Sequence, residues 1–215
     1  GLAQSKVAPH QARKRFYVTF ILANNRRKGL GCIMGLARVQ HHFCRFNRLV
    51  QTTRCIAAAR FDLATTSLFR PPNNPYVADY ILETRRSAMG GLVPSQAGAA
   101  LQLARVLDDG GNIGVLVDQK FRKGVKTHFF GRECRTNPLL PKLARQYDCD
   151  VYPARCKRLP GGRYRLIVED RITLPRQSDG TIDIDASAQL LNDVVERWVR
   201  EDPGQWMWFH KRWQM

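Results

Sequence analysis

Strand-like and helical patterns alternate along this chain from residue 63 onward, and this alternation limits the folds that it can adopt. The segments with strand-like composition are 63–69, 112–117, 149–156 and 163–170. The segments with helical periodicity are about 75–88, 96–109, 137–147 and 186–202. Strands that alternate with helices are typical of α/β proteins, so the sequence predicts a mixed, mostly parallel sheet flanked by helices.

Capping residues predict where these helices begin and end. Asn74, Ser95 and Asp185 each precede a helical pattern and are expected to be N-caps, because their side chains accept hydrogen bonds from unpaired amides of the first turn. The glycines at 110–111 are expected to end the second helix. The last helix carries a broad apolar stripe that predicts a buried face. The residues of that stripe are Leu190, Leu191, Val194, Val195, Trp198 and Val199.

The first 61 residues differ from the rest of the chain. They contain no Asp or Glu and 12 Lys or Arg residues, so they carry +12 of the net charge of +17. A stretch of this length ordinarily holds roughly seven acidic residues. Its apolar residues follow neither a helical nor a strand period for long. We therefore divide the chain into a basic, acid-free segment, residues 1–55, and an α/β domain, residues 56–215.

Charge and cysteine content narrow the classes of partner and site. A pI near 10.3 predicts attraction to nucleic acid, an anionic membrane surface, a phosphorylated small molecule or an acidic protein. The apolar run 16–23 is too short to span a bilayer, and we expect no signal peptide. The six cysteines form no CxxC pair, so we expect reduced thiols in a protein facing the cytoplasm and no metal site.

Two groups of polar residues follow predicted strands, where open α/β sheets place their sites. The groups are Arg70, Asn73 and Asn74 after 63–69, and Asp118, Gln119 and Lys120 after 112–117. The guanidinium of Arg70 is expected to hold a phosphate or a developing oxyanion, with Asp118 and Gln119 in the same cleft. The competing interpretation makes Arg70 a surface residue and Asp118 an ordinary loop acid.

The end of the chain, QWMWFHKRW, interleaves aromatic and basic residues. Its indole rings at 206, 208 and 213 alternate with His210 and Arg212, which we count as candidates for binding substrate. Such a segment can bind an acidic, partly apolar interface, since an indole tolerates one wet end. The alternative is a terminal element whose aromatic rings pack on the sheet.

Several blocks together resemble one family. In order, they are FRPPNNPYVADYI, GNIGVLVDQ, FFGR followed by NP, YPARCKRLPGGRYRL and QWMWFHKRW. Over residues 56–215 the chain is similar to the bacterial lipid A biosynthesis late acyltransferases, the lauroyl/myristoyl transferases of the lysophospholipid acyltransferase superfamily. The resemblance implies an α/β acyltransferase fold and a role in lipopolysaccharide synthesis.

The resemblance also implies a reaction, its partners and a location. The reaction is transfer of a fatty acyl group from acyl carrier protein to a hydroxyl of an anionic, diphosphorylated glucosamine-disaccharide lipid precursor. No metal or organic cofactor takes part. The implied location is the cytoplasmic face of the inner membrane, peripheral for a chain that lacks the family's N-terminal membrane-spanning helix. Nucleic acid is not an expected partner.

The family's catalytic box, H-F-x-N-aromatic-E, has one approximate match here. In HFCRFN, His42 stands at the position of the catalytic base, Arg45 replaces the Asn, and Asn47 stands where the carboxylate belongs. In the family the His takes the proton of the attacking hydroxyl and the carboxylate orients and charges the imidazole. The substitution predicts little or no acyltransferase activity for this chain.

A disturbed reading frame would explain the acid-free segment. Codons for Asp and Glu begin with GA, so a frame shifted by one base removes both residues and, in GC-rich genes, commonly introduces Arg, Gly, Ala and Cys. We expect the segment before Ile56 to be truncated, out of frame or degraded. Two interpretations of HFCRFN follow: a chance match, or a correctly placed box in which His42 is the catalytic base. The alternatives are a genuine basic arm and, for the whole chain, a basic nucleic-acid-binding module on an α/β core.

Overall fold

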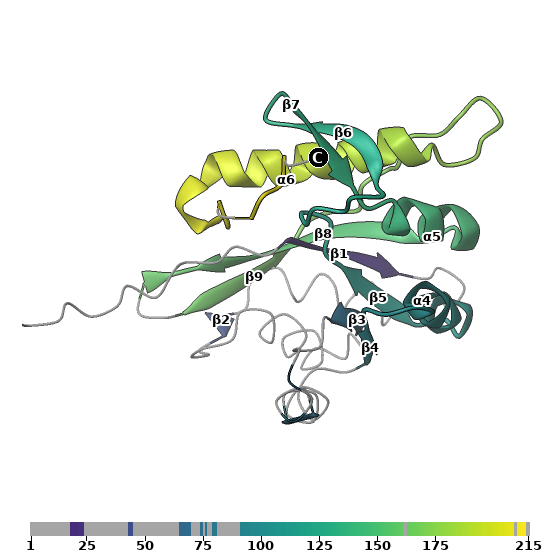
Figure 1. Ribbon diagram of the computed structural model, residues 1–215, viewed down its shortest axis with the longest axis horizontal. Coiled ribbons are helices and arrows are strands. Elements are labelled where there is room, and N and C mark those ends of the chain that lie inside the picture. The colour runs from purple at the N-terminus through teal and green to yellow at the C-terminus, as the bar shows by residue number, and fades with distance from the viewer. Residues whose placement is uncertain are drawn as a thin grey trace, which may run out of the picture.

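The protein is built on a mixed sheet with helices packed along it (Figure 1). The computed structural model describes residues 18–23, 43–44, 65–69, 74, 76, 79–80, 91–160, 163–208 and 210–213. Within these residues seven strands form the main sheet in the order β2-β9-β8-β1-β5-β3-β4. Their bounds are β1 Val18–Ala23, β2 Phe43–Cys44, β3 Thr65–Phe69, β4 Leu92–Pro94, β5 Asn112–Val115, β8 Asp150–Arg158 and β9 Tyr164–Val168.

The sheet is mixed, which confirms the predicted α/β class, but the described strands pair mostly antiparallel, so the expected mostly parallel arrangement is wrong. Strand β3 pairs in parallel with β4 and with β5. The pairings of β1 with β5 and β8, of β8 with β9, and of β9 with β2 are antiparallel. Among the described strands, parallel pairing is therefore confined to the group β5, β3 and β4. This group carries both of the strands whose ends were predicted to hold polar site residues.

Strand β1 is a central strand that the sequence patterns did not predict. It lies between β8 and β5, with Phe20 opposite Val115 and Ile21 opposite Tyr152. Its sequence, VTFILA, is a short apolar run, and such a run without alternation does not distinguish a strand from a buried helical segment. Strands β1 and β2 both come from residues 1–55, while the division of the chain at residue 55 stays a prediction.

A separate two-stranded hairpin, β6 Val125–Phe129 and β7 Arg132–Thr136, lies against the long helix α6, Ile184–Glu201 (Figure 1). Its two-residue turn has positive φ at Phe130 (54°) and Gly131 (70°), as the tightest hairpin turns require. Glu196 of α6 holds the turn by accepting a hydrogen bond from the Phe130 amide at 2.6 Å. The guanidinium carbon of Arg200 lies 4.8 Å from the centre of the Phe130 ring.

Two helices begin at residues other than those predicted. The helix α4, Ala99–Asp108, has Gly98 as its N-cap, so the predicted cap at Ser95 is wrong by three residues. The Ser95 amide donates to the Phe69 carbonyl at 2.7 Å. Helix α6 begins after Asp183, whose carboxylate accepts from the amides of residues 185 and 186. The predicted cap at Asp185 is therefore wrong by two residues.

The capping predictions at Asn74 and at the glycines after α4 agree with the structure, while the predicted end of the helix 75–88 lies outside the described residues. Gly110, with φ at 77°, follows the end of α4 as expected. The Oδ1 atom of Asn74 accepts from the amide of Tyr76 at 3.0 Å, and Tyr76, Asp79 and Tyr80 are helical. The third predicted helix is α5, Leu139–Tyr147, and a short 3-10 helix, η3 Pro203–Gln205, follows α6.

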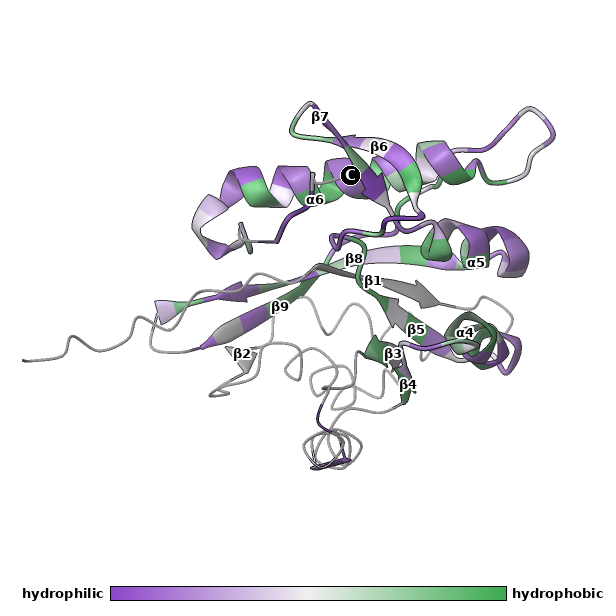
Figure 2. Cartoon of the chain, in the orientation of Figure 1, coloured by the Kyte–Doolittle hydropathy of each residue, from purple (hydrophilic) through white to green (hydrophobic). Residues whose placement is uncertain are grey.

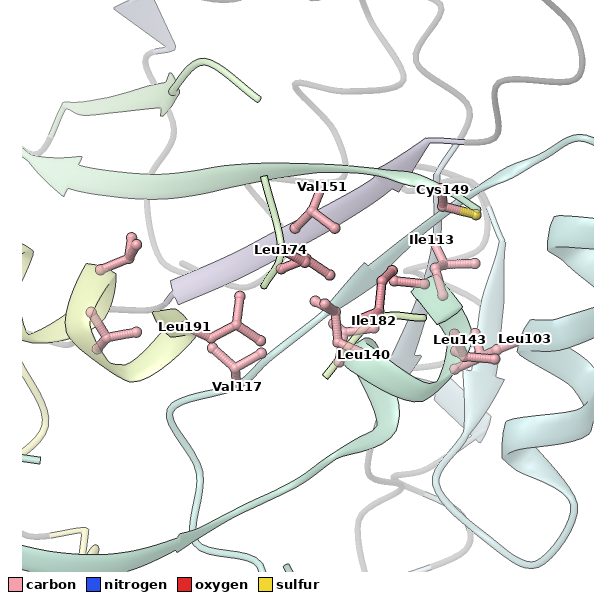
Figure 3. Packing of buried hydrophobic residues seen from close by; sticks show 14 of the residues in the cluster. Leu103, Ile113, Val117, Leu140, Leu143, Cys149, Val151, Leu174, Ile182 and Leu191 are labelled. Carbon is pink, nitrogen blue, oxygen red and sulfur yellow. The ribbon is translucent and has the colours of Figure 1, made fainter. Parts of the chain in front are cut away.

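One apolar core joins the helices to the sheet (Figure 3). Helix α5 contacts both α4 and α6, and all three contribute to the core. The labelled core residues include Leu103, Ile113, Leu140, Leu143, Val151 and Leu191. Figure 2 shows the hydrophobic stretches of β3, β5 and α4 next to one another, while α6 carries hydrophobic and hydrophilic residues. The stripe predicted for α6 is buried at Leu191, Val194, Val195, Trp198 and Val199.

The thiols of Cys134, Cys149 and Cys156 are buried in their reduced form. No helix among the described residues combines the length and the apolar composition needed to cross a bilayer.

Candidate active site

The loop that follows β5 and the end of the chain lie together, although about 90 residues separate them in sequence. The amide of Lys120 donates to Nε2 of His210 at 2.8 Å, and Nη1 of Arg212 donates to the carbonyl of Gln119 at 2.6 Å. Two groups of residues singled out separately in the sequence therefore form one structural unit. We call residues 118–120 the post-β5 loop and residues 206–213 the C-terminal segment.

Arg212 is a buried cation that uses both of its terminal nitrogens within the protein. Besides Gln119, Nη1 donates to the carbonyl of Arg135 at 3.2 Å. Nη2 donates to Oγ1 of Thr136 at 2.9 Å and to Oδ1 of Asn192 at 2.8 Å. The fork of a guanidinium can serve several acceptors at once, whereas an ammonium is a single point of charge. Arg212 thereby ties the C-terminal segment to the post-β5 loop, to β7 and to α6.

Asn192 and two threonines complete this network beneath the hairpin. The Nδ2 atom of Asn192 donates to Oγ1 of Thr127 at 2.9 Å and to Oγ1 of Thr136 at 3.0 Å. The two threonine oxygens lie 2.7 Å apart. Sequence patterns missed this network because its members come from separate elements. The available signal was Asn192 itself, a polar residue within the apolar stripe of α6.

Burial and nearby charge act in opposite directions on Arg212. Burial lowers the pKa of its guanidinium, and its electrostatic interactions with Cys134 and Asp118 partly oppose that effect by raising it. Arginine stays protonated in proteins, so the side chain keeps its charge. Asp118 is itself only 9% exposed, so this carboxylate and Arg212 supply opposite charges to one buried region. A buried negative charge in the post-β5 loop and a buried positive charge in the C-terminal segment thus stabilise each other.

His210 acts as a hydrogen-bond acceptor in this structure. Because the Lys120 amide donates to Nε2, that nitrogen carries no proton and the imidazole is neutral. Burial lowers the pKa of His210, and the positive charges of Arg212 and Lys120 lower it further. His210 and Arg212 both bond to the backbone of the post-β5 loop, and these bonds hold the loop in position.

The aromatic residues of the C-terminal segment divide between the core and the surface. Trp206 is buried, and its ring centre lies 5.3 Å from that of Phe129. Trp213 stacks on Phe129 at 5.8 Å and donates from Nε1 to the Phe129 carbonyl. Trp208 remains 49% exposed. Packing on the fold thus accounts for two of these indoles, while Trp208 packs edge-on against Trp206, donates to the Pro203 carbonyl and keeps about half of its surface in solvent.

The structure describes only some of the other residues that were predicted to form the site. Strands β3 and β5 run parallel and side by side, with Thr66 opposite Ile113, so their carboxyl ends lie at one edge of the sheet. This is the arrangement that a site shared by Arg70 and Asp118 requires. Residues Arg70, Asn73, His42 and Asn47 lie outside the described residues, so their roles stay predictions.

Comparison of the sequence with models of protein families identifies the family of this chain. Residues 57–215 match the model of the bacterial lipid A biosynthesis acyltransferases. The chain belongs to this family. A search of individual curated proteins found no match. The matched residues of this lipid A acyltransferase family member include the post-β5 loop and the C-terminal segment, and they begin after His42 and Asn47.

Membership of the family establishes a general role. The family consists of acyltransferases of lipid A, and hence of lipopolysaccharide, biosynthesis. Its members move an acyl group from a donor to a lipid acceptor. The family resemblance expected from the sequence blocks is therefore confirmed over almost the whole predicted domain.

Proposed function

We propose that this chain has the binding surfaces and the reaction chemistry of a lipid A acyltransferase that uses acyl carrier protein as its donor. The acceptor is a hydroxyl of a phosphorylated glucosamine-disaccharide lipid precursor at the cytoplasmic face of the inner membrane. The observation that carries the proposal is the family match over residues 57–215. The convergence of the post-β5 loop and the C-terminal segment, two of the blocks that resemble the family, supports it.

In the proposed reaction a general base activates the acceptor hydroxyl. His42 takes the hydroxyl proton as the oxygen attacks the thioester carbonyl, which becomes a tetrahedral oxyanion. Collapse of that intermediate breaks the carbon–sulfur bond, and the leaving thiolate takes the proton from the imidazolium. The products are an ester on the acceptor and the free thiol of the carrier. Arg70 stabilises the oxyanion or a substrate phosphate.

The post-β5 loop contributes the substrate side of the proposed site. Its backbone is fixed at Gln119 and Lys120, so their exposed and half-exposed side chains are presented from a constrained position. A loop whose backbone is already fixed loses less conformational entropy when its side chains bind a phosphate. His210 and Arg212 act in this proposal by positioning the loop.

Asn47, at the position of the family's carboxylate, is the reason that we expect low activity from this chain. An amide can hydrogen-bond an imidazole but does not stabilise the positive charge that the base acquires. In a serine protease, which offers an analogy for this pair, replacing the orienting Asp by Asn lowers turnover about 10⁴-fold. We therefore expect the unmodified chain to have little or no turnover, although its domain is that of the enzyme family.

An acyl-transfer assay tests both the reaction and this deficit. The chain is compared with its Asn47→Glu variant, using an acyl carrier protein thioester and the lipid A precursor, and the single variant His42→Ala serves as the blank. We expect trace turnover from the unmodified chain and a large gain from the added carboxylate. Robust turnover by the unmodified chain would refute the role given to Asn47. Inactivity of all three proteins would remove HFCRFN as the catalytic box.

The charge distribution supports one alternative function, a basic nucleic-acid-binding module. Its supporting observation is the net charge of +17, of which the acid-free first 61 residues carry +12. Salt sensitivity of binding does not separate the two functions, because both ligands are polyanions. Direct comparison of the ligands at equal charge does separate them.

A further inference from the structure

The turn beyond the post-β5 loop exposes one aromatic ring among cations. In residues 120–123, KFRK, the side chain of Phe121 is 41% exposed. Arg122 and Lys123 are exposed beside it, and Lys120 is half-exposed. We call residues 120–123 the KFRK turn. None of the ion pairs found within the described part of the chain includes any of its three cations.

Both ends of the KFRK turn are fastened to the fold. At its beginning the Lys120 amide is bonded to His210, next to the bond between Arg212 and Gln119. At its end the Gly124 amide donates to the Phe121 carbonyl at 2.8 Å, and Nη1 of Arg135 donates to the Gly124 carbonyl at 3.1 Å.

Residue 124 must be small for the turn to close. A Cβ atom there would lie 2.2 Å from the Thr136 carbonyl oxygen, far inside van der Waals contact. The chain thus holds the turn tightly against β7, and the exposure of Phe121 is a property of a constrained backbone.

We propose that the KFRK turn is an interfacial anchor for an anionic lipid bilayer. Phe121 would enter the boundary between headgroups and acyl chains, where an aromatic ring gains most, while Arg122, Lys123 and Lys120 contact lipid phosphates. Because the turn continues directly from the post-β5 loop, this contact brings the candidate active site to the surface that holds a lipid acceptor. The anchor deepens the proposed function, on which it rests for its choice of lipid surface.

The observations favour a bilayer over an acidic protein. A stable protein interface buries roughly 800 Å² on each partner around a packed apolar core. The KFRK turn offers a single ring with cations on both sides, which is the pattern of an interfacial membrane contact. Acyl carrier protein therefore serves as the competing partner in the test.

Vesicle binding by the full chain tests the anchor. Partition onto vesicles of phosphatidylglycerol and phosphatidylethanolamine is measured for the unmodified chain, for Phe121→Ser and for the double variant Arg122→Gln with Lys123→Gln. Each cation near an anionic surface contributes enough that losing two should weaken partition about 30-fold. Loss of the Phe121 ring should weaken partition about fivefold, a smaller effect because the ring is only partly exposed in the free protein.

Matched controls separate the anchor from general attraction by a basic protein. Lys142→Gln with Arg145→Gln removes the same charge from exposed positions on α5, and Leu101→Ser removes an apolar side chain that is 59% exposed on α4. We expect both controls to bind within about twofold of the unmodified chain. Equal losses in the KFRK variants and in their controls would overturn the proposal, and so would an absence of binding to the anionic vesicles.

Measuring acyl carrier protein binding and acyl transfer on the same variants separates the membrane anchor from a protein-docking surface and from the proposed reaction. Variants that weaken binding of acyl carrier protein and leave vesicle binding unchanged would overturn the anchor in favour of a protein-docking surface. Vesicle binding that depends on the KFRK turn, together with no acyl transfer by the Asn47→Glu variant, would support the anchor and count against the proposed reaction alone.

Discussion

At the scale of single residues, Arg212 is the link between the C-terminal segment and the rest of the fold. Its guanidinium bonds to the carbonyls of Gln119 and Arg135 and to the side chains of Thr136 and Asn192. A buried acceptor that loses its donor costs more than the bond itself contributed, because that acceptor has already left water. The geometry of this one side chain therefore bears on stability as well as on the position of the post-β5 loop.

Replacing Arg212 by Lys should destabilise the protein although it conserves the charge. An ammonium cannot reach all four acceptors, so at least one stays buried and unpaired, at a cost of about 2 kcal/mol in the free energy of unfolding. Urea denaturation followed by tryptophan fluorescence measures the difference. The same substitution at exposed Arg122 is the control and should change stability by less than about 0.5 kcal/mol. Equal stabilities for the two variants would show that the fork geometry of Arg212 has no structural role.

His210 should make stability depend on pH below neutrality. Its folded-state pKa lies below the ordinary value of 6.5, chiefly through burial and then through Arg212 and Lys120. Its contribution is thus fully present above pH 6.5 and is lost as the pH falls through the lowered pKa, when the protonated imidazole can no longer accept from the Lys120 amide.

The substitution His210→Gln tests this assignment. Glutamine keeps an acceptor for the Lys120 amide and does not titrate, so the fall in melting temperature between pH 7.5 and 5.5 should be smaller in the variant. Melting curves recorded across that range provide the comparison. Parallel curves for the two proteins would place the origin of any acid sensitivity elsewhere.

At the scale of elements, helix α6 shows what local sequence does and does not specify. Its buried stripe was predictable because apolar residues recur at three- and four-residue spacing. Its first residue was not, because Asp183 and Asp185 both precede that stripe and either could cap it. The backbone settles the choice, since Asp183 is extended and its carboxylate faces the amides of the first turn.

Other elements depend on partners far away in the chain. The hairpin turn requires positive φ at Phe130, which few sequences would suggest, and α6 holds that turn through Glu196. The candidate site was predictable as two separate groups of polar residues at strand and chain ends. Their meeting was not, because the hydrogen bonds between residues 119–120 and 210–212 depend on the whole path of the chain.

Removing the N-cap carboxylate of α6 at Asp183 should lower the stability of the protein more than removing the carboxylate of Asp185. Asp183→Ala leaves two first-turn amides without their acceptor and should lower stability by about 1 kcal/mol. Asp185→Ala is a control on the same turn that removes only a favourable charge near the helix N-terminus, at a cost of about 0.5 kcal/mol. Chemical denaturation of both variants provides the comparison. A larger loss at Asp185 would contradict the capping geometry.

At the scale of the whole molecule, the net charge does not choose between polyanionic ligands, whereas family membership does. The chain carries +17, which attracts any polyanion, yet residues 57–215 belong to the lipid A biosynthesis acyltransferases. The described domain also holds a fastened loop with cations and an exposed ring at its surface. We take these features together as a surface for an acylated, phosphorylated lipid.

Ligand-induced thermal stabilisation tests this central claim most directly, because it does not depend on turnover. The melting temperature of the unmodified chain is measured with the diphosphorylated glucosamine-disaccharide lipid precursor, with acyl carrier protein and with an oligonucleotide of equal charge at the same ionic strength. A ligand at one hundred times its Kd stabilises a protein by about 2.7 kcal/mol, which for a chain of this size raises the melting temperature by roughly 5–10 °C. We predict a shift of that size with the lipid precursor, a smaller one with acyl carrier protein and none with the oligonucleotide. Stabilisation by the oligonucleotide alone would contradict the claim.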